Sequence, residues 1–382
     1  MEQRDDARRS HTPFQVLLKP DEISLVAEAI LDKTVIPPLL VAEMHVTDRC
    51  NSACIFCNQR KARQRRAEMS LEFFENIIDE MHNEGLRGIR LSGGGEPTSH
   101  PQFSELLAIL QCRGISVTNL DTNGLLLSSS LCDDLLACNP RTVHVSLIAP
   151  DAELWARETC LPPKLYGTII SNIQRLAKQV ERENVRIVLS FVVDEITYAS
   201  LPRMESLAKE LGVEFFIHDL NTFNYTSEFN EKCMPVLLDS ISKLSKETLQ
   251  RRMYIKHLGE LEYKRNNIVS TNQAPASFCG TVCLAPWCAL MVKADGNMFP
   301  CCALVDSVNP LANLRDGSLS SCRSGSSYSK MREEARFLFI DRKANGKLEY
   351  LSPLCSGRCG PKMGIYSHPQ ITERIRLAKI GL

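Results

Sequence analysis

Residues 39–57 read LLVAEMHVTDRCNSACIFC, and this stretch decides the fold. The apolar run Leu40–Val46 has the length and composition of a buried strand. It leads into Cys50, Cys54 and Cys57, whose CxxxCxxC spacing puts three thiols on one short loop. Thiolates are soft ligands suited to iron–sulfur clusters. Three cysteines leave one iron of a [4Fe–4S] cluster open, so that iron can bind a further ligand.

Strand-like and helix-like segments alternate after this point. The predicted strands are Leu40–Val46, Gly88–Leu91, Ile115–Asp121, Thr142–Leu147, Arg186–Val193 and Val213–His218. The predicted helices are Ser70–Asn83, Gln102–Cys112, Ser128–Ala137, Tyr166–Glu183, Tyr198–Leu211 and Met234–Leu258. Such alternation predicts an α/β fold with a parallel sheet and right-handed crossovers. Six units predict a partial (β/α)6 TIM-like barrel, whose site lies at the carboxyl ends of the strands.

A glycine-rich turn, Ser92–Gly93–Gly94–Gly95–Glu96–Pro97, follows the second predicted strand. Consecutive glycines permit positive φ and close approach of the backbone to a ligand. By itself the motif is also typical of a plain turn. Its position one strand after the cysteine loop makes a joint site the better interpretation.

The cysteine loop and the glycine turn together resemble the radical S-adenosylmethionine (SAM) superfamily. The alternative is a structural zinc loop with His45 as fourth ligand, since zinc usually closes such a site with four protein ligands. The resemblance spans roughly residues 40–260. It implies that Cys50, Cys54 and Cys57 hold a [4Fe–4S] cluster, to which SAM binds.

The same resemblance implies the residues that bind SAM. They are Gly94, Gly95 and Glu96 at the amino group of the methionine portion, Phe56 near adenine, Ser146 at the ribose, Asn123 facing the cofactor and Arg157 at the carboxylate. An arginine–carboxylate fork suits the last of these tasks. For Ser146 and Asn123, a purely structural role as a strand-end polar group or a turn residue is as consistent with the sequence as a contact with SAM. Arg157 fits an ordinary surface residue better.

The composition changes after about residue 270. Eight of the sixteen cysteines lie between Cys279 and Cys359. A hairpin is predicted through Ala294–Gly296, because Asp–Gly is a turn signal. We therefore divide the chain into an extension (1–38), a partial barrel (39–270) and a cysteine-rich module (271–382).

This cysteine-rich module resembles the SPASM and twitch modules of radical SAM enzymes, which hold auxiliary iron–sulfur clusters. The resemblance implies one auxiliary cluster, held by ligands drawn from Cys283, Cys301, Cys355, Cys359 and Cys279. The pattern departs from a full SPASM module, because CxxxC stands where CxxC is expected and no final isolated cysteine follows. A structural zinc site is the alternative.

Composition restricts the partners and the compartment. Lysine plus arginine and aspartate plus glutamate number 45 each, so net charge gives no reason to expect nucleic acid or a membrane surface as partner. The polar N-terminus carries no secretory signal, and many cysteines without one favour the cytoplasm.

The resemblance implies reductive cleavage of SAM to a 5′-deoxyadenosyl radical, with a flavodoxin or ferredoxin-type electron donor. The expected reaction is oxidation of a small polar metabolite of the sugar or aminocyclitol type. The alternative substrate is a ribosomally made peptide that is cross-linked, epimerised or oxidised. The segment before Cys50 is shorter than the leader-binding domain that many peptide maturases carry, which favours the small molecule. A non-enzymatic zinc or iron–sulfur protein is the alternative of another class.

Overall fold

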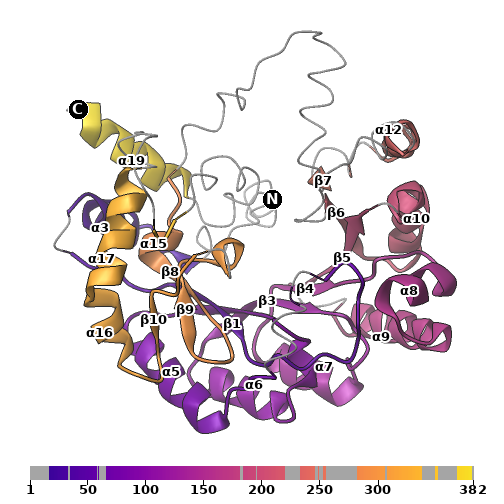
Figure 1. Ribbon diagram of the computed structural model, residues 1–382, viewed down its shortest axis with the longest axis horizontal. Coiled ribbons are helices and arrows are strands. Elements are labelled where there is room, and N and C mark those ends of the chain that lie inside the picture. Colours follow the sequence, from indigo (N-terminus) through magenta and orange to yellow (C-terminus); the bar gives the residue numbers. More distant parts are fainter. Residues whose placement is uncertain are drawn as a thin grey trace.

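A computed structural model describes most of the chain (Figure 1). The described residues are 17–32, 35–57, 59, 66–180, 184–194, 196–219, 233–245, 248, 253–254, 282–305, 308–337, 349–351 and 368–380. The predicted boundary between residues 270 and 271 lies outside them, as does most of the predicted extension before residue 17. The division of the chain into those three parts stays a prediction.

The described strands form one sheet in the order β10-β9-β8-β1-β2-β3-β4-β5-β6-β7. The strands are β1 (Val41–His45), β2 (Gly88–Ser92), β3 (Ser116–Thr122), β4 (Thr142–Val145), β5 (Arg186–Val193), β6 (Glu214–Asp219), β7 (Met253–Tyr254), β8 (Ala289–Val292), β9 (Asn297–Phe299) and β10 (Ala312–Asn313). Strands β1 to β8 pair in parallel, whereas β9 and β10 pair antiparallel. The order has two edges, so the described sheet is an open, partial barrel. The predicted α/β class is confirmed.

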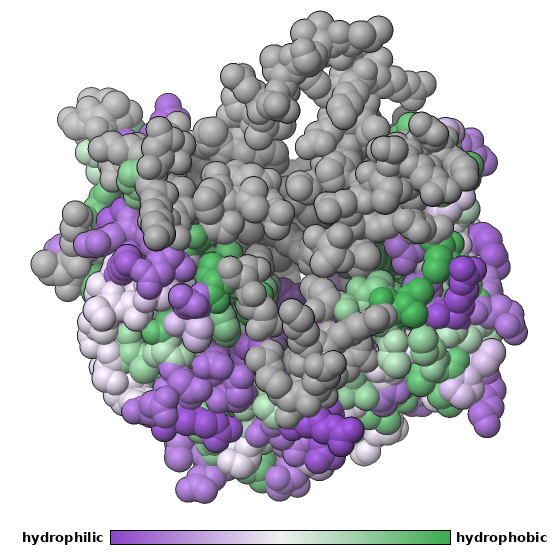
Figure 2. Space-filling model, viewed as in Figure 1, coloured by the Kyte–Doolittle hydropathy of each residue, from purple (hydrophilic) through white to green (hydrophobic). Residues whose placement is uncertain are grey.

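Helices cover the convex side of the curved sheet (Figure 1). They are α5 (Leu71–Asn83), α6 (Phe103–Cys112), α7 (Ser129–Ala137), α8 (Ala152–Thr159), α9 (Tyr166–Gln179), α10 (Leu201–Glu210) and α12 (Met234–Ser242), with α3 (Glu22–Leu31), α15 (Ala285–Cys288), α16 (Leu319–Ser324), α17 (Ser326–Ala335) and α19 (Pro369–Ile380) beside β8 and β1. Alternate strand residues such as Ala42, Met44, Ile89 and Leu91 are fully or almost fully buried against these helices. Hydrophilic side chains predominate on the outer surface of the lower helices (Figure 2). No described helix is both long and apolar enough to cross a bilayer.

The segment Met234–Leu258, predicted to be mainly helical, is interrupted: the described residues 243–245 and 253–254 are not helical, whereas Thr248 is. Helix α12 ends at Ser242, and β7 occupies Met253–Tyr254. Ser245 donates its backbone N–H and its hydroxyl to the Glu205 carboxylate on α10, and the Thr248 hydroxyl reaches the same oxygen. These bonds to another helix compete with continuation of α12.

The predicted hairpin at Ala294–Gly296 is confirmed, and its position in the sheet was not expected. Gly296 has a φ of +90°, which the turn between β8 and β9 requires. Strand β8 pairs with β1 in parallel, so that Val41 is opposite Ala289 and Met44 is opposite Val292. The cysteine-rich part of the chain therefore extends the barrel sheet itself.

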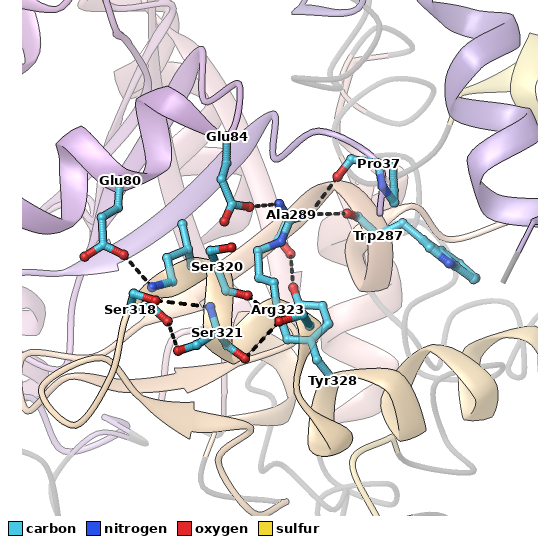
Figure 3. A network of polar contacts seen from close by, with 12 residues as sticks. Pro37, Glu80, Glu84, Trp287, Ala289, Ser318, Ser320, Ser321, Arg323 and Tyr328 are labelled. Atoms are coloured by element: carbon cyan, nitrogen blue, oxygen red, sulfur yellow. Dashed lines mark hydrogen bonds and ion pairs between the residues drawn. The ribbon is translucent and has the colours of Figure 1, made fainter. Parts of the chain in front are cut away.

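A buried arginine fastens α16 to this sheet (Figure 3). Arg323 is only 2% exposed and forms an ion pair with Glu84, at the end of α5. Its guanidinium also donates to the carbonyls of Pro37 (2.8 Å) and Trp287 (3.1 Å). The Tyr328 ring lies beneath it, 6.0 Å from ring centre to guanidinium carbon. Arg323 thus connects three segments that are far apart in the sequence.

We predict that Arg323→Met destabilises the protein strongly. The change leaves the Glu84 charge and two buried carbonyls without their donor, and breaking a buried pair in this way typically costs about 3–5 kcal/mol. Lys243→Met, which removes an exposed pair with Asp239, should cost no more than about 0.5 kcal/mol. Thermal unfolding of both variants checks this; equal midpoints would contradict it.

Candidate metal centre and cofactor site

The cysteine loop follows the carboxyl end of β1. Its two ends are joined by pairing of residues 47–48 with residues 67–68, and we call this paired base the closed neck. Asp48 N–H donates to the Ala67 carbonyl (2.8 Å), and Ala67 N–H returns a bond to the Asp48 carboxylate (3.2 Å). Thr47 forms an antiparallel bridge with Glu68, whose carboxylate lies 2.8 Å from the Arg49 guanidinium. Both ends of the loop are therefore held by the protein itself.

Cys50, Cys54 and Cys57 lie half-buried on this loop. The Ser52 hydroxyl lies 3.3 Å from Cys50 Sγ and 3.4 Å from Cys54 Sγ, and Cys57 N–H donates to the Cys54 carbonyl (3.3 Å). Among the described residues, no three histidine, cysteine or acidic side chains already lie close enough to share a metal ion. In a [4Fe–4S] cluster each thiolate binds a different iron, so the three sulfurs need not lie close enough to share one ion.

Helix α8 supports the middle of the cysteine loop from the side. Ala53 N–H donates to the Thr159 carbonyl (3.0 Å), and Ile55 N–H donates to the Glu158 carbonyl (2.9 Å). Cys160 ends α8 with a φ of +56°, so the helix stops where the loop meets it. The last carbonyls of a helix have no partner within the helix, and here the loop supplies the donors.

The glycine turn packs directly on the segment before Cys50. Gly95 N–H donates to the Thr47 carbonyl (3.1 Å), and Glu96 N–H donates to the Arg49 carbonyl (2.7 Å). A Cβ atom at Gly95 would lie 1.9 Å from the Arg49 oxygen, which is impossibly close. Glycine is therefore needed here for contact between the two loops. Gly94, which precedes Gly95 in the turn, is buried.

Glu96 closes the site on its other side. Its carboxylate accepts hydrogen bonds from the hydroxyls of Thr98 and Thr122 (both 2.6 Å) and from Asn123 N–H (2.7 Å). Burial raises the pKa of Glu96, and these donors partly offset the rise. Glu96 thus ties the end of β2 to the end of β3. A direct contact with SAM stays a prediction.

The remaining residues predicted to bind SAM differ in how closely they contact the cysteine loop and in how far they are buried. Asn123 donates from its amide to Asn51 (2.5 Å) on the cysteine loop. Phe56 is half-buried against the main core. Ser146 directly follows β4 and is exposed, while Arg157 is exposed on α8. The structure therefore joins Asn123 to the loop and leaves Arg157 at the surface.

Two predicted ligands of the auxiliary cluster are described, Cys283 and Cys301, and both are half-buried. Cys283 precedes α15, which leads into β8, and Cys301 follows β9. Because β8 runs parallel to β1 and β9 runs back, both cysteines lie at the end of the sheet where β1 begins. The cysteine loop lies at the opposite end. Cys279, Cys355 and Cys359 lie outside the described residues.

A buried acidic pair beside the cysteine loop was missed by the sequence reasoning. Glu158 is fully buried, and no N–H or O–H donor of the described residues reaches either carboxylate oxygen. Burial, together with the neighbouring Asp194 carboxylate after β5, raises the pKa of Glu158 to about 7. The Glu158 side chain gave no signal in the sequence, because it sits within an otherwise amphipathic helix.

Two family models match this chain. The first covers the cysteine loop and the glycine turn, and the second covers Cys283 and Cys301. The model described as the radical SAM superfamily matches residues 44–208, and the model described as an iron–sulfur cluster-binding domain, SPASM, matches residues 283–360. The chain belongs to the radical SAM superfamily, SPASM subgroup. The two models imply [4Fe–4S] clusters, and the chemistry of the donor set fits one, since three thiols share a loop next to a glycine turn.

Several curated proteins are similar to this radical SAM protein. A tungsten-containing aldehyde ferredoxin oxidoreductase cofactor-modifying protein of Pyrococcus furiosus is 27% identical over 45% of this chain; the match spans only 48% of that relative. A probable GTP 3′,8-cyclase of Methanosarcina mazei is 26% identical over 69% of this chain and 77% of its own length.

Solved structures share the fold. Streptococcus suis SuiB bound to its precursor peptide SuiA superposes with a TM-score of 0.58 at 16% identity, over 81% of this chain and 70% of SuiB. The protein anSMEcpe, with bound AdoMet and the Cp18Cys peptide, gives 0.55 at 18% identity, over 89% of this chain and all of that one. These likenesses establish the fold alone.

We predict that Gly95→Ala disrupts the metal centre. The added methyl group collides with the Arg49 carbonyl, so the glycine turn must move away from the cysteine loop. Reconstituted protein should then bind less iron and lose most of its affinity for SAM. Gly167→Ala on α9 is the control, because its Cβ would meet nothing within 4 Å and alanine favours a helix. The measurements are the iron content and the equilibrium affinity for SAM of both variants. A Gly95→Ala protein with the iron content and SAM affinity of the parent would contradict the packing argument.

We also predict a pH-dependent effect of Glu158→Gln. Because the folded-state pKa of Glu158 is raised to about 7, the carboxyl lowers stability progressively as the pH rises from about 4.5 to 7. Glutamine does not ionise, so the variant should gain about 1–3 kcal/mol relative to the parent between pH 5 and 8.

The measurement for Glu158→Gln is the unfolding midpoint of variant and parent across that pH range. Glu153→Gln, on an exposed position of the same helix, should track the parent. If Glu158→Gln also tracks the parent, Glu158 is ionised at little cost in the folded protein.

Proposed function

We propose that this radical SAM protein removes a hydrogen atom from a small polar metabolite and that the net reaction is an oxidation. The observation that carries the proposal is the contact between the glycine turn and the cysteine loop at the carboxyl ends of β1 and β2. When bound, a [4Fe–4S] cluster with an open iron supplies the electron that cleaves SAM to methionine and a 5′-deoxyadenosyl radical.

The residues around the loops have definable tasks in this proposal. Cys50, Cys54 and Cys57 would hold the cluster, and the neck at Thr47–Arg49 fixes the direction in which the loop projects. Helix α8 holds one side of the loop in place through the backbone bonds from Ala53 and Ile55. A protein of the flavodoxin or ferredoxin type would supply the electron.

The auxiliary site supports an oxidative outcome. Cys283 and Cys301 lie at the end of β1 opposite the cysteine loop, and the five residues of β1 span roughly 15 Å at about 3.3 Å each. A substrate on the sheet would lie between the two sites. An auxiliary cluster at this position is suited to accept the electron that an oxidised substrate gives up.

A peptide substrate is the second candidate. The solved structures of similar fold include SuiB with a precursor peptide, whereas the curated relative with the longer match is named for GTP, a small molecule. The small molecule is favoured because that relative matches over most of both chains.

We predict that anaerobically reconstituted, reduced protein converts SAM to 5′-deoxyadenosine. Cys54→Ala should abolish this, because two thiolates do not retain the cluster in a form that binds SAM. Cys112→Ala, at the exposed end of α6, is the control. Chromatography of the product checks both. A fully loaded, reduced parent that leaves SAM intact would favour the non-enzymatic alternative.

A further inference from the structure

The inner, concave side of the sheet is polar along five successive strands. Glu43 on β1 lies opposite Arg90 on β2, and Asp121 on β3 lies opposite His144 on β4. Ser190 on β5 contacts His144, with its hydroxyl 3.3 Å from Nδ1. We call these five residues the inner row. The residues that alternate with them face the helices and form the main core.

Charged residues at these positions need an explanation. In closed barrels of this type the inward positions are filled by branched apolar side chains. Burying a charge is costly unless it is paired. Here the barrel is open, and the side chains of Arg90 and Asp121 remain 27% and 23% exposed. The inner row is therefore partly accessible to a ligand.

The two arginines described on this face, Arg90 and Arg186, are already paired with carboxylates. Arg90 donates to Asp121 Oδ2 (2.6 Å) and lies 3.7 Å from Glu43, while Arg186 donates to Glu214 (2.9 Å). Lys293, beyond β8, is 1% exposed, with its ammonium 5.9 Å from the centre of the Phe299 ring. A phosphate or carboxylate would have to displace one of these partners.

The accessible groups that remain are suited to neutral hydrogen-bonding partners. Arg90 Nε and Nη2 each lie 2.6 Å from Asp121 Oδ2, so these two contacts leave Asp121 Oδ1 to other partners. Burial lowers the pKa of His144 to about 4, so its imidazole is neutral near pH 7. A neutral imidazole offers one donor and one acceptor; Nδ1 already contacts the Ser190 hydroxyl, which leaves Nε2 for a ligand. The edge of this ring faces Phe216, 6.5 Å between centroids, which supplies an apolar wall.

We propose that the inner row binds a neutral hydroxylated or amino-bearing part of the substrate, through Asp121, His144 and Ser190, and excludes phosphorylated and carboxylated compounds. This inference deepens the proposed function and rests on it, since it names the substrate class of the same site.

The test is binding of matched probes to the reconstituted holoenzyme, measured by saturation-transfer NMR and titration. The neutral and amino probes are myo-inositol, D-glucose and streptamine; the anionic probes are myo-inositol 1-phosphate, glucose 6-phosphate and glucuronate. We expect the first group to bind and the second to bind at least about tenfold more weakly, because each anion disrupts an existing ion pair.

Variants assign the binding to the inner row. Asp121→Asn and His144→Phe should each weaken binding of the neutral probes about tenfold or more. Asp134→Asn is the control for Asp121→Asn, since Asp134 lies on α7, where it accepts an exposed hydrogen bond from the Ser104 hydroxyl. It should leave both probe binding and SAM cleavage unchanged. Thermal unfolding of every variant establishes that the variants are folded.

The outcomes separate the two proposals. Anionic probes that bind as well as the neutral ones, neutral probes that do not bind, or binding that survives both Asp121→Asn and His144→Phe would each overturn the inner-row proposal. Production of 5′-deoxyadenosine by the same preparation reports on the proposed function independently. A preparation that binds neutral probes and does not cleave SAM would sink the proposed function while retaining the binding site.

Discussion

The structure depends on β1, because both edges of this strand are hydrogen-bonded. On one side β1 pairs with β2, which leads into the glycine turn; on the other it pairs with β8, which leads into the hairpin between Cys283 and Cys301. Its own carboxyl end leads into the cysteine loop. A parallel sheet aligns neighbouring strand ends, so one five-residue strand sets the relative positions of all three elements.

Side-chain contacts reinforce this arrangement where backbone pairing ends. Gly95 allows the glycine turn to touch the backbone of Arg49, and Glu96 collects donors from β3. On the opposite side, Arg323 draws α16 onto α5 and the approach to β1. The conformations of the loops at the site are therefore set by contacts with other segments of the chain rather than by the local conformational preferences of the loop residues.

Much of the fold could be predicted from local patterns. The apolar runs marked β1 to β6, and the CxxxCxxC spacing with the following glycines indicated the family. The pairing of β8 with β1 could not be predicted, because it joins segments about 250 residues apart and the Ala289–Val292 run reads equally as a hairpin strand. The end of α12 depended on Glu205 from another helix, and the Glu158–Asp194 pair depended on the meeting of α8 with β5. In each case the deciding partner is distant in the sequence.

The closed neck of the cysteine loop has a consequence for metal loading. Closing a flexible loop costs conformational entropy that grows slowly with its length. In small zinc modules the metal supplies the free energy of that closure and folds the chain. Here the pairing of Thr47 and Asp48 with Ala67 and Glu68 has already brought the ends together. The protein itself thus makes the closure that a zinc module obtains from its metal, and the free energy of binding a cluster is not needed to join the two ends of this loop.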